Sequence, residues 1–132
     1  MTRGPIAAGL AAVLLGVLLV IRNAAADDLA RGRVVFQRCV ACHSIDPAEK
    51  PLPGPNLFGI VGRHAGNDPD YDYSPVLRAA RRDGLMWTEA ALDLYLKDTE
   101  AFLPGTVMGF QKIDGADDRR ALIVFLKAGN RR

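Results

Sequence analysis

The chain has 132 residues, of which 49% are hydrophobic and 24% are charged, and its formal net charge is +2. This length allows one domain of ordinary size and excludes most multidomain enzymes. The composition predicts a folded core and argues against a disordered tail or a coiled coil. Removing Arg3 and Arg22, which flank an N-terminal apolar run, from the 17 basic residues leaves 15, equal to the number of acidic residues. A near-neutral domain lacks the positive surface that nucleic acid requires, so we expect no nucleic-acid partner.

The N-terminus is typical of an export signal. Residues 6–21 are 16 apolar or glycine residues, preceded by Arg3 and followed by three alanines at 24–26. As a helix this run spans about 24 Å, which is shorter than the ~30 Å hydrocarbon core of a membrane. We therefore expect residues 1–26 to be a cleaved signal peptide and residues 27–132 to fold in the periplasm. The alternative is an uncleaved anchor that holds the domain on the periplasmic face of the membrane.

The first two predicted helices are bounded by recognisable end signals. Asp28 is a candidate N-cap for a helix that runs to Cys39. Ser74 followed by Pro75 is the pattern of an N-cap and a first helical residue, and Gly84 is suited to end this second helix.

Two more helices are predicted nearer the C-terminus. Thr88 is a candidate N-cap for the third, and Asp117 and Asp118 favour the start of the fourth, which Gly129 ends. In three of the four predicted helices the residues expected to pack inward fall on one face, as in amphipathic helices. They are Leu29, Gly32, Val35 and Phe36 in the first helix, Leu92, Tyr95 and Leu96 in the third, and Leu122, Phe125 and Leu126 in the fourth.

The connection between His43 and Ser74 is about 30 residues long and rich in proline and glycine. A connection of this length in a small domain is usually functional or disordered. Its apolar residues argue against disorder and need a surface to pack on: Leu52, Leu57, Phe58, Ile60 and Val61. A large apolar cofactor in the middle of the domain would supply that surface.

The only two cysteines stand in a C-x-x-C-H sequence over residues 39–43, which is the attachment signature of c-type haem. Cys39 and Cys42 lie one helical turn apart and can add to the two vinyl groups of the porphyrin, while His43 faces the iron. Three other uses of the pair stay open. The first is a thioredoxin-like dithiol, which normally occurs in a βαβ unit. The second is a zinc site, for which His64 is the only further histidine. The third is a small structural disulfide.

The second axial ligand decides between electron transfer and binding of small molecules. Of the three methionines, Met1 leaves with the signal peptide and Met86 is assigned to core packing. Met108 lies in a loop with Phe110 nearby, and we expect it to bind the iron. A neutral thioether raises the reduction potential and serves both oxidation states, which favours fast electron transfer.

These motifs together resemble the class I c-type cytochromes over residues 28–129. Gly32 and Phe36 are similar to the family's N-terminal helix, which packs against the C-terminal one. The Gly-Pro-Asn-Leu sequence at 54–57 looks like the segment in which the proline carbonyl, here of Pro55, accepts a hydrogen bond from the ligating histidine. The resemblance implies an all-α cytochrome c fold, with about four short helices and long loops wrapped around one covalently bound haem c.

The resemblance also implies roles for four further residues. Arg63, Tyr73 and Trp87 correspond to the groups that hydrogen-bond the haem propionates, and Tyr95 to a tyrosine whose hydroxyl lies near the methionine sulfur. His64 has no assigned role and is expected in a surface loop.

The function that the resemblance implies is one-electron transfer in the periplasm, with no catalysis. The expected partners are redox proteins, namely a membrane respiratory complex or a periplasmic dehydrogenase or oxidase, and we expect a monomer. Val107 stands where the family usually has a lysine, so a positive haem face is not predicted. The alternatives are a fixed cytochrome subunit of a larger redox enzyme, or a haem peroxidase or gas sensor with an open iron position.

Overall fold

The computed structural model describes residues 24–50, 52–108 and 112–129. These ranges contain helices and no strand, which confirms the all-α prediction, and one isolated bridge joins His64 to Met86. Residues 24–36 form an N-terminal helix, followed by α2 (Pro75–Arg82), α3 (Glu89–Lys97), α4 (Thr99–Phe102) and α5 (Ala116–Gly129). Most of the predicted signal peptide and Phe110 lie outside the described residues. Within them, no helix combines the length and the apolar character that crossing a bilayer requires.

The N-terminal helix begins earlier than Asp28, so the prediction of Asp28 as its N-cap is wrong. Residue 24 is already helical, because the alanines at 24–26 are strong helix formers and continue the helix backwards. The Asp28 carboxylate instead pairs with Arg120 of α5 at 3.4 Å. The helix ends at Phe36 rather than at Cys39, since the next N–H groups bond to carbonyls three residues back in a tighter turn.

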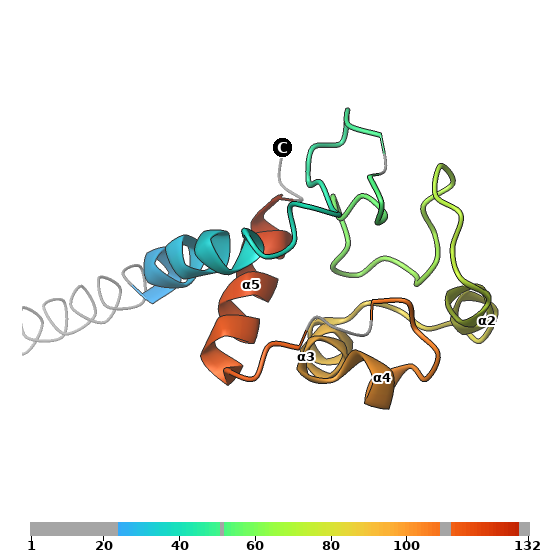
Figure 1. Cartoon of the computed structure of the whole chain (residues 1–132). Coiled ribbons are helices and arrows are strands. Elements are labelled where there is room, and N and C mark those ends of the chain that lie inside the picture. Colours follow the sequence, from blue (N-terminus) through green and yellow to red (C-terminus); the bar gives the residue numbers. More distant parts are fainter. Residues whose placement is uncertain (1–23, 51, 109–111, 130–132) are drawn as a thin grey trace, which may run out of the picture.

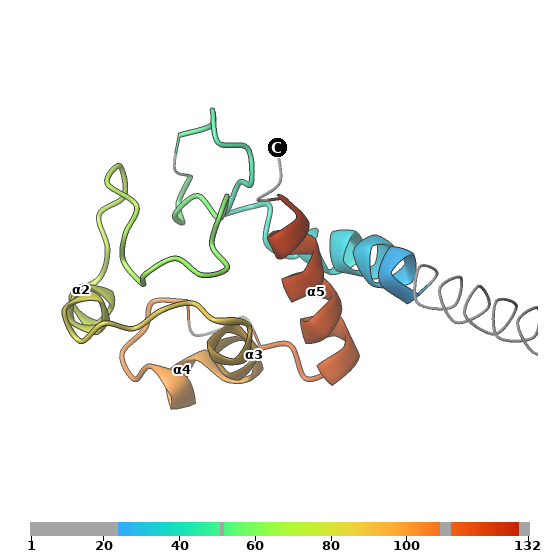
Figure 2. The ribbon, with the colours of Figure 1, turned by 180° about the vertical axis from the view of Figure 1, so that it is seen from behind.

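The N-terminal helix and α5 cross each other in both ribbon views, with α3 and α4 adjacent to α5 and α2 at the far end of the molecule (Figures 1 and 2). Gly32 permits this contact, because a Cβ there would lie 2.1 Å from the carbonyl oxygen of Ala121. The rings of Phe36 and Phe125 then pack with centroids 5.4 Å apart. This confirms the predicted packing of the two terminal helices.

The predicted start and end of α2 and the predicted start of α3 are confirmed. The Ser74 hydroxyl accepts a hydrogen bond from the N–H of Leu77 at 3.4 Å, and Gly84 follows the helix with φ +81°. At the start of α3, the Thr88 hydroxyl accepts from the N–H of Ala91 at 3.1 Å. Both caps satisfy N–H groups that have no partner within their helix.

The single turn of α4 was not predicted from the sequence. Asp98 begins it by accepting a hydrogen bond from the N–H of Ala101 at 3.0 Å. Four residues are too few to show helical periodicity, so only the capping aspartate could have signalled this turn. The predicted four helices therefore become five helical segments in the described part of the chain.

The long connection after His43 is ordered by side-chain hydrogen bonds rather than by regular structure. The buried Asn56 amide donates to the carbonyls of Asp46 at 2.7 Å and Glu49 at 3.0 Å, and its oxygen accepts from the N–H of Phe58 at 2.8 Å. Such bonds satisfy buried backbone groups that would otherwise lack partners. The connection can therefore pack its apolar residues inward, although Leu52 remains 38% exposed.

Candidate functional site: a cavity for a haem

A cavity of about 230 Å³ lies in the interior between the long connection and the helices. Its wall is mainly apolar and is formed by side chains of the N-terminal helix, α2, α3 and α5: Phe36, Leu77, Leu92, Leu96, Leu122 and Leu126. The structure brings eight of the nine predicted site residues to this cavity: Cys39, Cys42, His43, Pro55, Tyr73, Trp87, Tyr95 and Met108. Arg63 is the exception.

The two cysteines stand on one turn of chain at the edge of this cavity. The N–H groups of Cys42 and His43 both bond to the carbonyl of Cys39, at 3.1 and 2.9 Å. Both thiols are free of a disulfide. Burial raises the pKa of the Cys39 thiol, and the neighbouring Arg38 guanidinium opposes that rise. Within the described ranges, no three His, Cys, Asp or Glu side chains converge as a metal site, so the zinc alternative has no ligand set there.

His43 is oriented by backbone groups of the long connection. Its Nδ1 lies 2.8 Å from the carbonyl oxygen of Pro55. A carbonyl can only accept, so Nδ1 carries the proton and Nε2 keeps its lone pair. Gly54 makes this approach possible, because a Cβ there would lie 2.4 Å from Cε1 of His43. Burial lowers the pKa of His43 and the hydrogen bond to Pro55 opposes this shift, so a neutral imidazole is favoured.

Met108 is half-buried and also lines the cavity. Its carbonyl accepts a hydrogen bond from the Thr99 hydroxyl at 3.3 Å. Two residues earlier, the buried Thr106 hydroxyl shares a hydrogen bond of 2.9 Å with the hydroxyl of Tyr95. Burial raises the pKa of Tyr95, and the bond to Thr106 opposes that rise. The sequence predicts Tyr95 near the sulfur of Met108, but it gives no signal that Thr106 is the partner of the Tyr95 hydroxyl.

Comparison with models of known protein families gives no match, but individual proteins match well. Cytochrome c2 of Agrobacterium tumefaciens is 40% identical over 99 residues, which cover 75% of this chain and 89% of the relative. Cytochrome c2 of Blastochloris viridis is 39% identical over 110 residues, 83% of this chain and 84% of the relative. A solved structure of cytochrome c2 from Rhodospirillum centenum is 34% identical with a TM-score of 0.70, covering 75% of this chain and 95% of that one.

The chain belongs to the class I c-type cytochromes. This confirms the resemblance seen in the sequence. The cytochrome is an electron-transfer protein and not an enzyme, and it carries one haem c attached through Cys39 and Cys42. Because both cysteine sulfur atoms are bonded to the haem, the pair acts neither as a dithiol nor as a disulfide.

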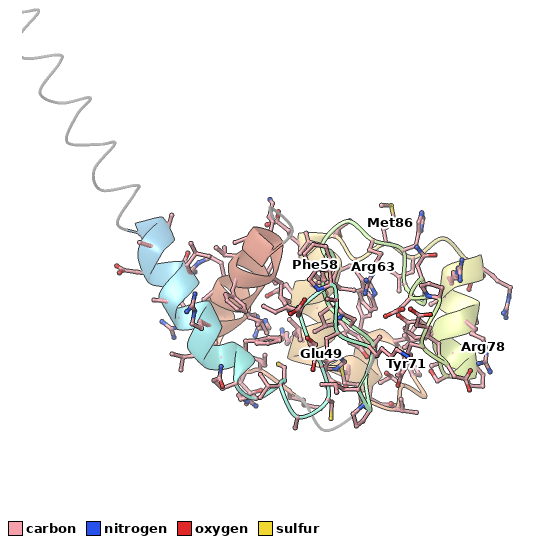
Figure 3. All side chains as sticks on the ribbon, turned by 90° about the horizontal axis from the view of Figure 1, so that it is seen from above. Glu49, Phe58, Arg63, Tyr71, Arg78 and Met86 are labelled. Atoms are coloured by element: carbon pink, nitrogen blue, oxygen red, sulfur yellow. The ribbon has the colours of Figure 1, made fainter. Side chains whose placement is uncertain are left out.

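Met86 is not in the core, so the prediction that it packs there is wrong. Its side chain is 40% exposed and points outward at the edge of the molecule (Figure 3). Met86 lies in an extended stretch, where successive side chains alternate between two faces. Leu85 and Trp87 pack against the core, and Met86 consequently faces out beside the exposed His64. Met108 is the only described methionine that lines the cavity.

Arg63 does not line the cavity, and most of its guanidinium is engaged with the backbone. Nη1 donates to the carbonyl of Phe58 at 3.1 Å and Nη2 to that of Asn56 at 2.7 Å, which holds the side chain inside the long connection (Figure 3). The remaining nitrogen, Nε, is buried without a partner. A buried donor of a cationic group without an acceptor is costly, and it points to an anionic group as its partner.

Tyr73 and Trp87 lie on the cavity wall. The Tyr73 hydroxyl accepts from the N–H of Asp68 at 3.3 Å, so its own proton is available for another acceptor. Burial raises the pKa of Tyr73, which keeps it protonated. The Trp87 ring packs against Tyr95 with centroids 4.9 Å apart. Apolar walls, paired thiols and donors for acidic groups therefore fit a haem with its propionates.

Proposed function

We propose that this cytochrome is a periplasmic one-electron carrier in which His43 and Met108 are the axial ligands of the haem iron. The observation that carries the proposal is the pairing of two different ligands in one cavity. These are a neutral imidazole fixed by Pro55 and the thioether of Met108. The haem supplies the redox centre, and the chain holds its ligands and excludes water.

The ligand pair suits reversible electron transfer. The hydrogen bond from His43 Nδ1 to the Pro55 carbonyl raises the basicity of the other ring nitrogen and fixes the ring plane. The neutral Met108 sulfur favours the ferrous state and so raises the reduction potential. Because both ligands serve both oxidation states, little rearrangement accompanies each transfer, and no iron position is open to a substrate.

The haem propionates are assigned to three donor groups, two of them on residues of the cavity wall and one in the long connection. Arg63 Nε, the Tyr73 hydroxyl and the Trp87 indole N–H are the groups proposed to bind them. The buried Nε without a protein partner supports this assignment most directly. A bound propionate would also give the Arg63 cation a counter-charge in the interior.

The proposed partners are redox proteins, a membrane respiratory complex or a periplasmic dehydrogenase or oxidase, which a monomer would meet across an apolar rim. Val107 on the Met108 loop is 68% exposed and Val40 between the cysteines is 44% exposed. The nearby Lys112 is paired with Asp98 at 2.8 Å, which cancels its charge. We therefore expect electron exchange with ferricyanide to respond weakly to ionic strength, because charge steering at this rim is small.

The location rests on the N-terminal sequence. Cleavage after residue 26 would release the domain into the periplasm, whereas retention of residues 1–26 would bring it to the membrane surface. Mass spectrometry of the haem protein purified from an exporting host distinguishes the two, since the cleaved chain would begin at Asp27.

The test of the ligand pair is the absorption spectrum of the protein exported into a periplasm with haem-attachment machinery. We expect low-spin haem with the weak long-wavelength band of a ferric iron bound to methionine sulfur. Met108→Ala should keep covalent haem, lose this band, lower the potential and bind carbon monoxide in the ferrous state. Met86→Ala is the matched control and should change none of these. An unchanged potential in Met108→Ala would contradict the ligand assignment.

A further inference from the structure

Arg119 in the first turns of α5 is a buried cation outside the cavity. Only 6% of the residue is exposed. Its Nε donates to Asp93 of α3 at 2.7 Å, and its Nη1 donates to the carbonyls of Ile113 and Asp114, both at 2.8 Å. One guanidinium thus joins α3, α5 and the segment that leaves the Met108 loop.

Stability alone does not explain a cation at this position. Desolvating the buried guanidinium offsets much of its attraction to Asp93, whose side chain is 40% exposed, and an apolar side chain in place of a buried charge is often equally stabilising or better. What the guanidinium adds is geometry, because its planar fork donates in fixed directions. At this site Nε donates to Asp93 of α3, and Nη1 alone donates to two successive backbone carbonyls, those of Ile113 and Asp114. Arg119 therefore determines where this segment of backbone lies relative to α3.

The same segment is tied to α3 a second time. The N–H of Ile113 bonds to the carbonyl of Leu96 at 2.9 Å, and the Ile113 side chain is buried. On the other side, the fully buried Thr99 holds the carbonyl of Met108 at 3.3 Å. The backbone is therefore held both at Met108, by Thr99, and at Ile113, five residues further along the chain. Of the anchors after Met108, Arg119 makes charge-assisted hydrogen bonds, which are stronger than neutral ones.

We propose that Arg119 is a positioning residue that keeps Met108 on the haem iron by fixing the backbone at Ile113 and Asp114. This inference rests on the proposed ligation by Met108. Only four residues separate Met108 from Ile113, so loss of the fork releases the C-terminal end of the ligand loop. The sulfur then competes less well for the iron with a ligand from solution.

The test is imidazole binding to the purified ferric haem protein, followed by loss of the long-wavelength methionine band. Arg119→Met should bind imidazole about tenfold more tightly than the parent, and Arg119→Lys, which keeps the charge without the fork, should fall between them. A tenfold change corresponds to ~1.4 kcal/mol, close to one hydrogen bond to a charged group. If Arg119→Met does not accumulate with haem, Arg119→Lys carries the comparison.

Two controls separate positioning from a merely structural role. Arg120→Met removes the neighbouring arginine, whose side chain is 57% exposed and pairs with Asp28 and Asp117. Ile123→Val weakens the core of α5, where Ile123 is buried. Both should leave imidazole binding within about twofold of the parent, although Ile123→Val lowers the melting temperature.

The outcomes are distinct. If the parent shows the methionine band and Arg119→Met binds imidazole no more tightly, the positioning role is wrong while the ligand assignment stands. If Ile123→Val matches the change in Arg119→Met at equal loss of stability, Arg119 acts only through overall stability. If the parent itself lacks the methionine band, the ligation by Met108 fails, and the role of Arg119 fails with it.

Discussion

The two proposed ligands are held in contrasting ways. His43 is held by backbone groups: its N–H bonds to the carbonyl of Cys39 in the preceding turn, and its ring bonds to the carbonyl of Pro55. The segment around Met108 is held by side chains from helices, with Thr99 in α4 as the direct contact. Backbone groups are present whatever the side chain, but side-chain anchors can be lost by a single substitution. We therefore expect loss of a side-chain hydrogen bond to disturb the methionine side, whereas the histidine side should respond to a change that displaces the ring or the backbone, as at Gly54.

Removal of the haem should have the largest effect, because it takes away the surface on which both sides pack. Synthesis without the export signal in a host lacking haem-attachment machinery should give a chain without a cooperative thermal transition by circular dichroism. The apolar wall side chains would then face water instead of the cofactor. A sharp, reversible transition of the haem-free chain would show that the protein core suffices alone.

Gly54→Ala should be the most damaging single change on the histidine side. Its new Cβ would lie 2.4 Å from Cε1 of His43 and 2.8 Å from the carbonyl oxygen of Cys42, so the ring or the backbone must move. Overpacking of this kind costs about 1–3 kcal/mol of unfolding free energy, measurable by denaturant titration. Gly129→Ala is the control, since nothing lies within 4 Å of its added Cβ. Equal stability of the two variants would contradict the steric role of Gly54.

Tyr95→Phe should weaken the methionine side by a smaller amount. The buried Thr106 hydroxyl loses the hydrogen bond of 2.9 Å that it shares with Tyr95, and the net contribution of such a bond to stability is about 0.5–1.5 kcal/mol. We expect lower unfolding free energy together with a weaker methionine band in the ferric spectrum. Tyr71→Phe removes a hydroxyl bonded to the carbonyl of Pro53, an exposed residue, at 2.9 Å. Water can replace that bond, so this control should change little.

The smallest effect should come from Asp98, the N-cap of α4. The hydrogen bond from Lys112, aided by that from the N–H of Ala101, lowers the pKa of its carboxyl group. A lowered pKa means that the pair stabilises the fold above the ordinary aspartate pKa and that this contribution is lost as pH falls through the lowered value. In an NMR titration, Lys112→Met should shift the Asp98 pKa upward. Added salt should reduce the difference between parent and variant, since both groups are exposed to solvent.

Much of this arrangement could be predicted from local sequence signals. The cysteine pair with His43 is a short motif whose geometry follows from one turn of chain. Ser74 and Thr88 were recognised as caps because the hydroxyl that caps a helix stands beside it in the sequence. The predictions for Asp28 and Met86 were wrong because neighbouring residues in the sequence are compatible with either outcome. Asp28 could begin the helix or lie within it, and Met86 could face the core or the solvent. Alanines before Asp28 extended its helix, and alternation along an extended stretch turned Met86 outward.

Local patterns along the chain are enough to predict the class of fold, the haem attachment through Cys39 and Cys42, and the four longer helices. These depend on spacing and on end signals that act within a few residues. Three features emerge only from the folded chain: the Tyr95 hydroxyl pairs with Thr106, Nε of Arg63 is left without a partner, and Arg119 joins α3 to the segment after Met108. The contacts of Tyr95 and Arg119 join residues from different helices or loops, and Arg63 is held by carbonyls within the long connection. In each case the directions of the donors are fixed only once the chain has packed.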